Sequence, residues 1–262
     1  MKVSLRPLFA LPLAAAALAA PLAAHAQSIG ASFGDGSALT NVAATDVVGA
    51  PGFAQANFTN LTTATGTALR DSSGTATTVA ATVTRAIAGD NLTFSPIRTA
   101  AADASERFNN GIVYTDLGGL NLSLTNIPYA SYSIVLYSLN AVTSAPERFT
   151  IGSTTLFVRP PANPIGAGYL DNNAATPFTY IRSTGATAAT AAAGSDYVVF
   201  TGLSGSSQTV SILGNSSDGG STFPTDIGGF QIVATAAPVP EPATLAALGL
   251  GAAALLRRRR SA

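Results

Sequence analysis

Paired carboxylates are the only catalytic groups that the mature part of this sequence could place around a substrate. Asp103 and Glu106 form one candidate pair, and Glu147 with a distant aspartate forms another. A glycoside hydrolase needs two such carboxyls, one as the acid and the other as the base or nucleophile. Arg107 and Arg148 directly follow these acids, so solvated charge pairs on loops explain the same residues. No spacing singles out an acid–base pair. We therefore expect a non-catalytic protein, with a carboxylate-dependent glycoside hydrolase as the alternative.

Other reactive side chains are scarce. The 262-residue chain has no Cys, and its single His and single Lys are His25 and Lys2, both within the first 26 residues. After residue 26, a Ser-His-Asp triad, a Cys–His pair, a lysine Schiff base and a histidine metal site are therefore impossible. The lack of Cys also excludes a disulfide framework and a cysteine zinc site.

Two short polar segments contain oxygen ligands of the kind that Ca²⁺ prefers. Asp171 precedes two asparagines, and Asp218 precedes two glycines. Asp and Asn oxygens bind Ca²⁺ in many extracellular proteins, but the same residues are also favoured in turns. The ligand spacing of an EF-hand is missing. We expect no cofactor, and Asp171 and Asp218 are the candidate ligands if calcium binds.

Aromatic side chains could form a platform on which a sugar ring stacks. In a strand-rich protein, however, aromatic residues more often belong to the core, with tyrosine hydroxyls at its rim. We favour the core interpretation. The residues concerned are Tyr114, Tyr129, Tyr169, Phe178 and Tyr180.

Asparagine and threonine residues suggest two further surface roles. Asn57 and Asn60 each begin an N-glycosylation pattern, which matters only in hosts with that machinery. Threonines are frequent in residues 62–67 and 75–84, but these segments have no repeat. Ice binding, the second role, would need a flat, regular threonine ladder and hence a repeat, so we do not expect it here.

Short strands must position these residues, because period-two alternation of apolar and polar residues is common between residues 27 and 236. Leu120, Leu122 and Leu124 alternate with polar residues, as in a strand with one buried face. Residues 132–139 are apolar on both faces, as expected of a central strand between two layers. Ten or so short strands with Gly- and Pro-rich turns predict an all-β fold, a single β-sandwich over residues 27–236. The other expected strands are 79–85, 112–116, 148–151, 154–159, 178–182, 197–201, 208–213 and 230–235.

Three segments interrupt the strand pattern. Residues 160–173 contain several prolines and are expected to form a long loop. Residues 184–194 are rich in Ala and Thr and could form a short helix or a disordered loop. Residues 237–242 form a proline-rich linker, which should be stiff and extended.

The N-terminal 26 residues have the three parts of a secretory signal peptide. Lys2 and Arg6 form a basic start, residues 8–22 are mostly apolar, and small residues follow at Ala24 and Ala26. This order predicts cleavage by signal peptidase after Ala26, which leaves Gln27 as the first mature residue. The apolar run is shorter than the roughly 20 residues that a membrane anchor needs.

The C-terminus combines a proline motif, an apolar segment and a basic end. Residues 243–256 are uncharged and would span about 21 Å as a helix. The hydrocarbon core of a bilayer is about 30 Å thick, so this short transmembrane helix would require local thinning. Residues 257–262 form a basic tail that should stay cytoplasmic, which places residues 27–236 on the other side. The motif is Val239-Pro240-Glu241-Pro242, and the basic cluster is Arg257, Arg258, Arg259 and Arg260.

The charge distribution argues against a nucleic-acid partner. The whole chain has 13 basic and 13 acidic residues. Residues 27–236 contain seven arginines and twelve acids, which leaves this part with a net charge of −5. A nucleic-acid-binding domain would instead show a basic patch.

The C-terminal arrangement resembles the PEP-CTERM sorting signal of Gram-negative bacteria. The resemblance rests on Pro240-Glu241-Pro242, residues 245–256 and the arginines 257–260. It implies recognition by an exosortase, a membrane protease that removes the tail and releases the protein or transfers it to the cell surface. The protein would then be held at the inner membrane only transiently. The alternative is a periplasmic binding protein that stays anchored permanently.

Four further phrases resemble a domain of secreted PEP-CTERM proteins and some extracellular carbohydrate-active proteins. This family implies a jelly-roll sandwich of the galactose-binding-like kind, without assigned catalytic residues. Relatives often have Trp where Phe58 stands here, so one obvious sugar-stacking platform is missing. We expect an exported surface, extracellular-matrix or biofilm protein that contacts polysaccharide. The phrases are residues 28–34, 127–132, 197–203 and 227–233.

Overall fold

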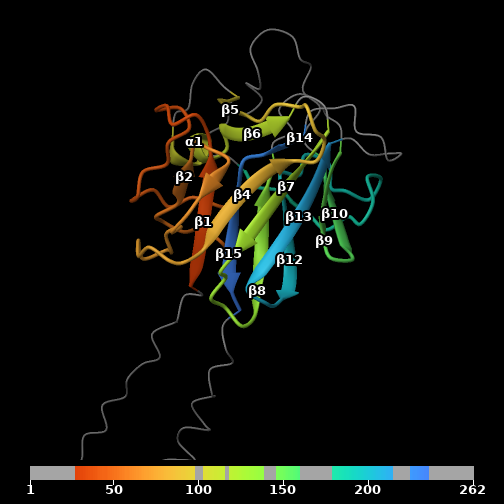
Figure 1. The fold of residues 1–262 in the computed structure, drawn as a ribbon. Helices are drawn as coiled ribbons and strands as arrows, with labels where there is room; N and C mark the ends of the chain where they lie inside the picture. Colours follow the sequence, from red (N-terminus) through yellow and green to blue (C-terminus); the bar gives the residue numbers. More distant parts are fainter. Residues whose placement is uncertain are drawn as a thin grey trace, which may run out of the picture.

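The computed structural model describes residues 27–97, 103–115, 118–138, 146–159, 179–214 and 225–235. Within these residues the fold is nearly all β, and its sheets pack face to face as a sandwich (Figure 1). The β-sandwich expected from the alternating pattern is therefore confirmed.

The first sheet has six strands in the order β11-β12-β8-β15-β1-β2. The first and last long strands of the chain, β1 and β15, pair antiparallel, while β2 runs parallel to β1. Its members are β1 (Ser28–Phe33), β2 (Thr59–Leu61), β8 (Tyr132–Tyr137), β11 (Arg182–Ser183), β12 (Tyr197–Leu203) and β15 (Gly229–Ala234).

The second sheet also has six strands, in the order β10-β9-β13-β7-β4-β3, and all its pairs are antiparallel. Its members are β3 (Thr65–Gly66), β4 (Ala80–Arg85), β7 (Gly119–Thr125), β9 (Glu147–Ile151), β10 (Thr154–Val158) and β13 (Ser207–Gly214). A small third sheet at one end contains β5 (Thr93–Pro96), β6 (Gly111–Thr115) and β14 (Thr225–Ile227). The helix α1 (Ala104–Phe108) lies near this end (Figure 1).

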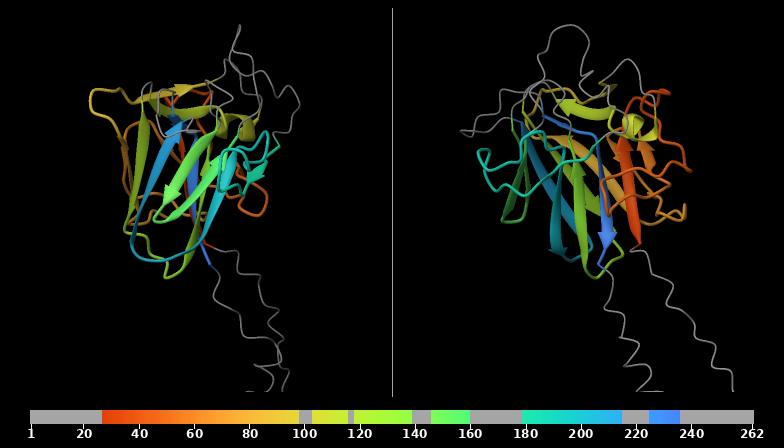
Figure 2. Two further views of the ribbon diagram at one scale, coloured as in Figure 1. Left: turned by 90° about the vertical axis from the view of Figure 1, so that its right-hand side faces the viewer. Right: turned by 180° about the vertical axis from the view of Figure 1, so that it is seen from behind.

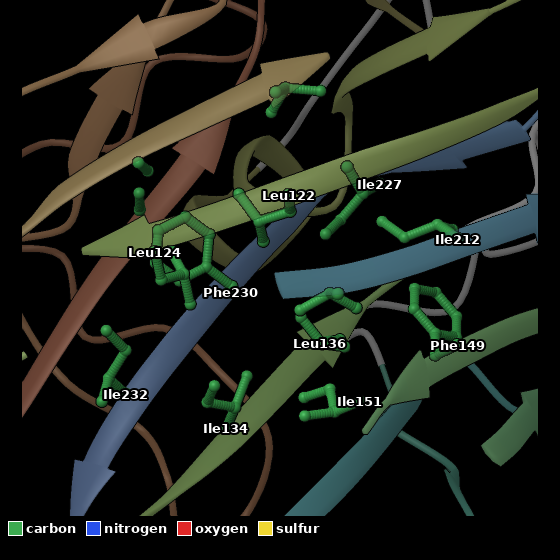
Figure 3. Close-up of a cluster of buried hydrophobic side chains, with 14 of the residues drawn as sticks. Leu122, Leu124, Ile134, Leu136, Phe149, Ile151, Ile212, Ile227, Phe230 and Ile232 are labelled. Carbon is green, nitrogen blue, oxygen red and sulfur yellow. The ribbon is translucent and has the colours of Figure 1, made fainter. Parts of the chain in front are cut away.

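The main core fills the space between the two large sheets (Figure 3). Leu122 and Leu124 of β7 point inward and are fully buried, together with Ile134 and Leu136 of β8. The polar residues between the leucines point outward, because successive side chains of a strand alternate between its two faces. Burying each such aliphatic side chain contributes roughly 1.5–3 kcal/mol to folding.

The first sheet is covered on its outer face as well. Val135 and Tyr137 of β8 point away from the main core and pack in a second apolar cluster with Phe58 and Phe108. The segment 34–58 and α1 supply much of this cover, and residues 179–196 lie along the same side (Figure 2). The prediction that residues 132–139 form a central strand with two buried faces is thus confirmed for β8.

Most of the expected strands appear, and one does not. The segment 178–182 yields only the two-residue strand β11, because Tyr180 and Ile181 are not in a strand. Tyr180 instead packs against the second cluster, and its hydroxyl accepts a hydrogen bond from Asn109 Nδ2 at 2.9 Å. Packing of one aromatic side chain therefore overrides the local strand pattern.

Residues 184–194 form neither of the two expected structures. They are a series of ordered turns in which Thr187 and Thr190 hydrogen-bond each other's backbone N–H through their hydroxyls. Such side-chain bonds compete with helix formation. The expected loop at 160–173 and the linker at 237–242 lie outside the described residues.

The helix α1 is an element that the sequence analysis did not predict. Asp103 caps its N-terminus, and Asp103 Oδ1 accepts a hydrogen bond from the Glu106 N–H at 2.8 Å. This spacing of Asp and Glu is a known helix-start signal. No helix in the described part of the chain has the length and apolar character needed to cross a membrane.

Candidate functional site

Two carboxyl groups meet inside the sandwich where three strands come together. Glu147 begins β9, Asp226 is the middle residue of β14, and Ser138 directly follows β8. The Ser138 hydroxyl contacts the Glu147 carboxyl and lies 3.3 Å from Oδ1 of Asp226. The backbone N–H of Asp226 donates to Glu147 Oε1 at 2.9 Å. We refer to Glu147 and Asp226 as the carboxyl pair.

The contacts of Ser138 and the burial of both acids favour a proton on the carboxyl pair. Ser138 has one hydroxyl proton, yet its oxygen lies within bonding distance of both carboxyls. Since an ionised carboxylate can only accept, one of the two contacts needs a proton from a carboxyl. Burial raises the pKa of Glu147 well above its usual value, and the neighbouring charge of Asp226 raises it further. The protonated form of Glu147 is therefore favoured.

The carboxyl pair can hold a proton, but it is closed to a substrate. Glu147 is 0% exposed and Asp226 is 1% exposed. In the described part of the chain, no three His, Cys, Asp or Glu residues gather as a metal group. Ca²⁺ takes six to eight oxygen ligands, more than Glu147, Asp226 and Ser138 supply. The arrangement suits an internal ionisable group rather than an open catalytic site.

The structure corrects the interpretation of Glu147 as a solvated loop charge. It brings Glu147 together with a distant aspartate, as the alternative interpretation required, but places both inside the fold. The alternating pattern of β9 already indicated that Glu147 is buried, because Glu147 lies on the same face of the strand as Phe149 and Ile151. Asp226 and Ser138 were not predicted, and only the packing of three distant strands brings them to Glu147.

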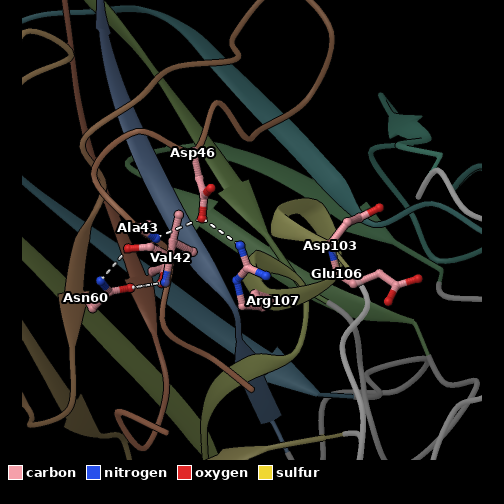
Figure 4. A network of polar contacts seen from close by, with 8 residues as sticks. Val42, Ala43, Asp46, Asn60, Asp103, Glu106 and Arg107 are labelled. Atoms are coloured by element: carbon pink, nitrogen blue, oxygen red, sulfur yellow. Dashed lines mark hydrogen bonds and ion pairs between the residues drawn. The ribbon is translucent and has the colours of Figure 1, made fainter. Parts of the chain in front are cut away.

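The other predicted carboxylates, Asp103 and Glu106, both lie at α1 (Figure 4). Asp103 caps α1, and Glu106 is largely buried. Arg107 does not neutralise these neighbours but pairs with Asp46, with 2.8 Å between Nη2 and Oδ2. This ion pair attaches the 34–58 segment to α1. The expectation of a local charge pair at residues 103–107 is therefore wrong.

Another buried acid, Asp196, lies beside the second apolar cluster. Asp196 Oδ1 accepts a hydrogen bond from the Ile181 N–H at 3.1 Å, and burial raises the pKa of Asp196 to about 8. Next to it, the ring of Tyr197 stacks on that of Tyr137 with 5.9 Å between centroids. The Tyr137 hydroxyl donates to Gln231 Oε1 at 2.5 Å. These contacts make the cluster a packed second core.

The three described tyrosines considered as a sugar platform, Tyr114, Tyr129 and Tyr180, lie in different parts of the fold. Tyr180 belongs to the second cluster, Tyr129 packs against the main core, and Tyr114 lies in the third sheet. Burial raises the pKa of Tyr129 to about 12, and its hydroxyl has no hydrogen-bond partner in the described structure. The core interpretation holds for Tyr129 and Tyr180, while Tyr169 and Phe178 lie outside the described residues.

The two asparagines of the glycosylation patterns have internal partners. Asn60 brackets Val42, since Asn60 Nδ2 donates to its carbonyl and Asn60 Oδ1 accepts from its N–H, both at 2.9 Å (Figure 4). Asn57 Nδ2 donates to the Ser72 carbonyl at 2.9 Å. Both amides therefore stabilise the fold of the segment that covers the first sheet.

Most of the residues predicted to matter at the two chain ends lie outside the described residues. Of the cleavage-site residues Ala24, Ala26 and Gln27, only Gln27 is described. The remaining predicted residues and segments lie outside the described residues: Val239, Pro240, Glu241, Pro242, the apolar segment 243–256, Arg257, Arg258, Arg259, Arg260, and the calcium candidates Asp171 and Asp218.

Comparison with known proteins identifies the tail. Residues 238–260 match the PEP-CTERM protein-sorting motif. No match is found among curated proteins. The match begins three residues after Thr235, where the described sandwich ends, and includes the proline motif and the four arginines. The chain therefore carries the sorting motif of exported proteins that an exosortase processes, as the resemblance implied.

Proposed function

We propose that this protein is a non-catalytic component of the cell surface or extracellular matrix that associates with polysaccharide. The observation that carries the proposal is the sorting motif at residues 238–260, directly behind a β-sandwich. In this proposal the N-terminal 26 residues direct export, the tail holds the protein briefly at the inner membrane, and an exosortase then removes the tail.

The position of the chain ends supports this route. The Gln27 carbonyl accepts a hydrogen bond from the Ala234 N–H at 2.9 Å, so the first and last described residues lie side by side (Figure 1). A signal peptide and a sorting tail attached there would leave the sandwich at the same end. The sandwich could thus complete its fold outside the membrane while either segment is still attached. The end that carries the third sheet would then point away from the bilayer.

The surroundings of the acidic side chains support a non-catalytic role. Glu147 and Asp226 are buried together, Asp103 caps a helix and Asp46 pairs with Arg107. Each carboxyl has a structural partner, which accounts for it without a reaction.

Mass spectrometry of protein recovered from the cell surface tests the route. We expect an N-terminus at Gln27 and a C-terminus near Pro242. Replacing Pro240, Glu241 and Pro242 with alanine should leave the intact tail in the membrane fraction. The control Pro51→Ala, in an exposed turn of the sandwich outside the matched motif, should be processed normally. An intact tail on surface-exposed native protein would contradict the proposal. Native protein that stays in the inner membrane with its arginines would indicate permanent anchoring instead.

A further inference from the structure

The outward-facing residues of the second sheet form rows of small hydroxyl side chains that run across its strands. The strand registers define three rows, which we call the hydroxyl face. The first row is Thr65, Thr82, Ser123 and Thr209; the second is Thr84, Asn121, Ser211, Thr150 and Thr155; the third is Ala80, Thr125 and Ser207.

Strand alternation turns these residues outward. Their neighbours in the same strands, such as Val83, Leu122 and Val210, are at most 1% exposed and belong to the main core. Row members on adjacent strands are about 4.8 Å apart, and successive rows are about 6.7 Å apart along the strands. Ten of the twelve positions are Thr or Ser, and none is charged. The first charge appears one row further on, at Arg148 opposite Leu213.

The polar groups of the hydroxyl face are free to bind a ligand. Thr150 and Thr155 share one hydrogen bond of 3.1 Å between their hydroxyls. In the described part of the chain, the other hydroxyls of the face and the Asn121 amide have no side-chain hydrogen bond. Each hydroxyl can both donate and accept, and the amide offers both groups. The face can therefore match hydroxyl groups of either polarity.

The two large sheets differ in what covers them. The outer face of the first sheet carries the second apolar cluster, whereas no described segment lies across β4, β7 and β13 in Figure 1. The preference of Thr for strands explains individual threonines on a solvated sheet. It does not explain a whole face without charged side chains, since about a quarter to a third of a typical protein surface is charged.

We propose that the hydroxyl face binds a neutral polysaccharide laid across the strands, an assignment that rests on the proposed function and names its binding surface. A face without charge offers nothing to an anionic or cationic polymer, because electrostatic complementarity selects such partners. Short Thr and Ser side chains lose little conformational entropy when they are immobilised. The bonds are individually weak, so an extended chain that contacts many row members binds better than a single sugar.

Affinity electrophoresis of the mature protein in gels that contain dextran, hydroxyethyl cellulose or alginate tests this assignment. We expect retardation by at least one of the two neutral polymers and none by anionic alginate. The double variant Thr82→Val/Thr209→Val removes two hydroxyls of one row but keeps side-chain shape and strand preference. It should weaken binding about tenfold. Thr93→Val/Thr201→Val, on the third and first sheets, is the matched control and should bind within twofold of the native protein.

A second variant distinguishes a loss of binding from a loss of folding. Ser211→Lys places a long charged side chain in the centre of the face and should abolish retardation, while the urea unfolding midpoint stays close to the native value. If both face variants bound as well as the native protein does, the hydroxyl face would not be the binding site, although the association with polysaccharide would stand. Lack of binding to all three polymers would contradict the proposed association itself. If the native protein bound growing ice crystals but no glycan, and the face variants lost this binding, the hydroxyl face would be an ice-binding surface. That result would overturn our proposal.

Discussion

The carboxyl pair is an ionisable group inside the sandwich. Glu147 and Asp226 are both buried, and a proton on one of them allows Ser138 to form hydrogen bonds with both. Folding therefore raises the pKa of Glu147, chiefly through burial. Because the folded protein then binds more protons than the unfolded chain, the free energy of unfolding falls as pH rises above the usual carboxyl pKa.

Replacement of Glu147 by Gln should remove this pH dependence. Gln resembles the protonated acid, so it can accept from the Asp226 N–H and donate to Ser138. We expect the variant to gain stability relative to the native protein between pH 5 and pH 8. The difference in unfolding free energy should grow by up to about 1.4 kcal/mol per pH unit. Urea unfolding across this pH range measures it.

Asp35→Asn is a control of opposite sign. Hydrogen bonds from the Ser37 side chain and backbone lower the pKa of Asp35, so its contribution to stability is present above the usual carboxyl pKa and is lost on acidification. The Asn variant should therefore be less stable than the native protein at pH 7, with the difference vanishing in acid. If the difference in unfolding free energy between Glu147→Gln and the native protein stayed constant with pH, Glu147 would not carry the proton that we infer.

Asn60 stabilises the segment that covers the first sheet. Its amide satisfies both backbone polar groups of Val42, a residue only 2% exposed. Asn60→Ala leaves these groups without partners and should lower the unfolding free energy by about 1–3 kcal/mol. Thermal unfolding followed by circular dichroism measures the loss. Asn121→Ala removes an amide that has no side-chain hydrogen bond among the described residues and should change the melting temperature little. Equal effects of the two variants would refute the role of Asn60.

At the scale of elements, the sandwich depends on one close approach between sheets. A Cβ on Gly111, the first residue of β6, would lie 1.9 Å from the Phe33 carbonyl oxygen at the end of β1. Gly111 and Phe33 both belong to packed strands, so neither backbone can move far enough to make room for a Cβ. Only glycine allows the third sheet to begin so close to the first.

Gly111→Ala should consequently destabilise the fold by about 2 kcal/mol or more. The matched control is Gly152→Asn, in the turn between β9 and β10, where a Cβ meets no neighbour and φ is +57°. Asn tolerates this left-handed conformation, so the control should lose less than about 1 kcal/mol. Unfolding in urea compares the two, and a Gly111→Ala protein as stable as the control would rule out the close approach.

At the scale of the whole molecule, the pairing of β1 with β15 holds the two described ends together. Ser28 lies opposite Val233, and Cα atoms of such partners are about 4.5–5.5 Å apart. The chain has no Cys of its own, so introduced cysteines report on this geometry without interference.

The variant Ser28→Cys/Val233→Cys should form an intramolecular disulfide under mild oxidation, because the separation lies within the range for a disulfide. Gel mobility with and without reductant detects the bond. The control Ser28→Cys/Thr93→Cys places its cysteines in β1 and β5, which belong to different sheets, and should remain reduced. If the first variant failed to cross-link while folded, the chain ends would not be neighbours, and both signals could not leave from one end.

Local patterns in the sequence determined most of the strands and the sorting tail. The alternation of Leu120, Leu122 and Leu124 predicted a one-sided strand, and the apolar run at 132–139 predicted the two-sided central strand β8. The tail was recognisable because its proline motif, apolar segment and arginines are contiguous. Each of these features is complete within a few neighbouring residues, so no knowledge of folding was needed.

Only the tertiary structure decided which distant residues meet. The partner of Glu147 is 79 positions away, and nothing local distinguishes Asp226 from other aspartates. The hydroxyl face likewise has no linear repeat, because its rows run across β3, β4, β7, β13, β9 and β10. Alternation fixes which way a residue points along one strand, but the order and register of the strands fix its neighbours. Those depend on the packing of the whole core.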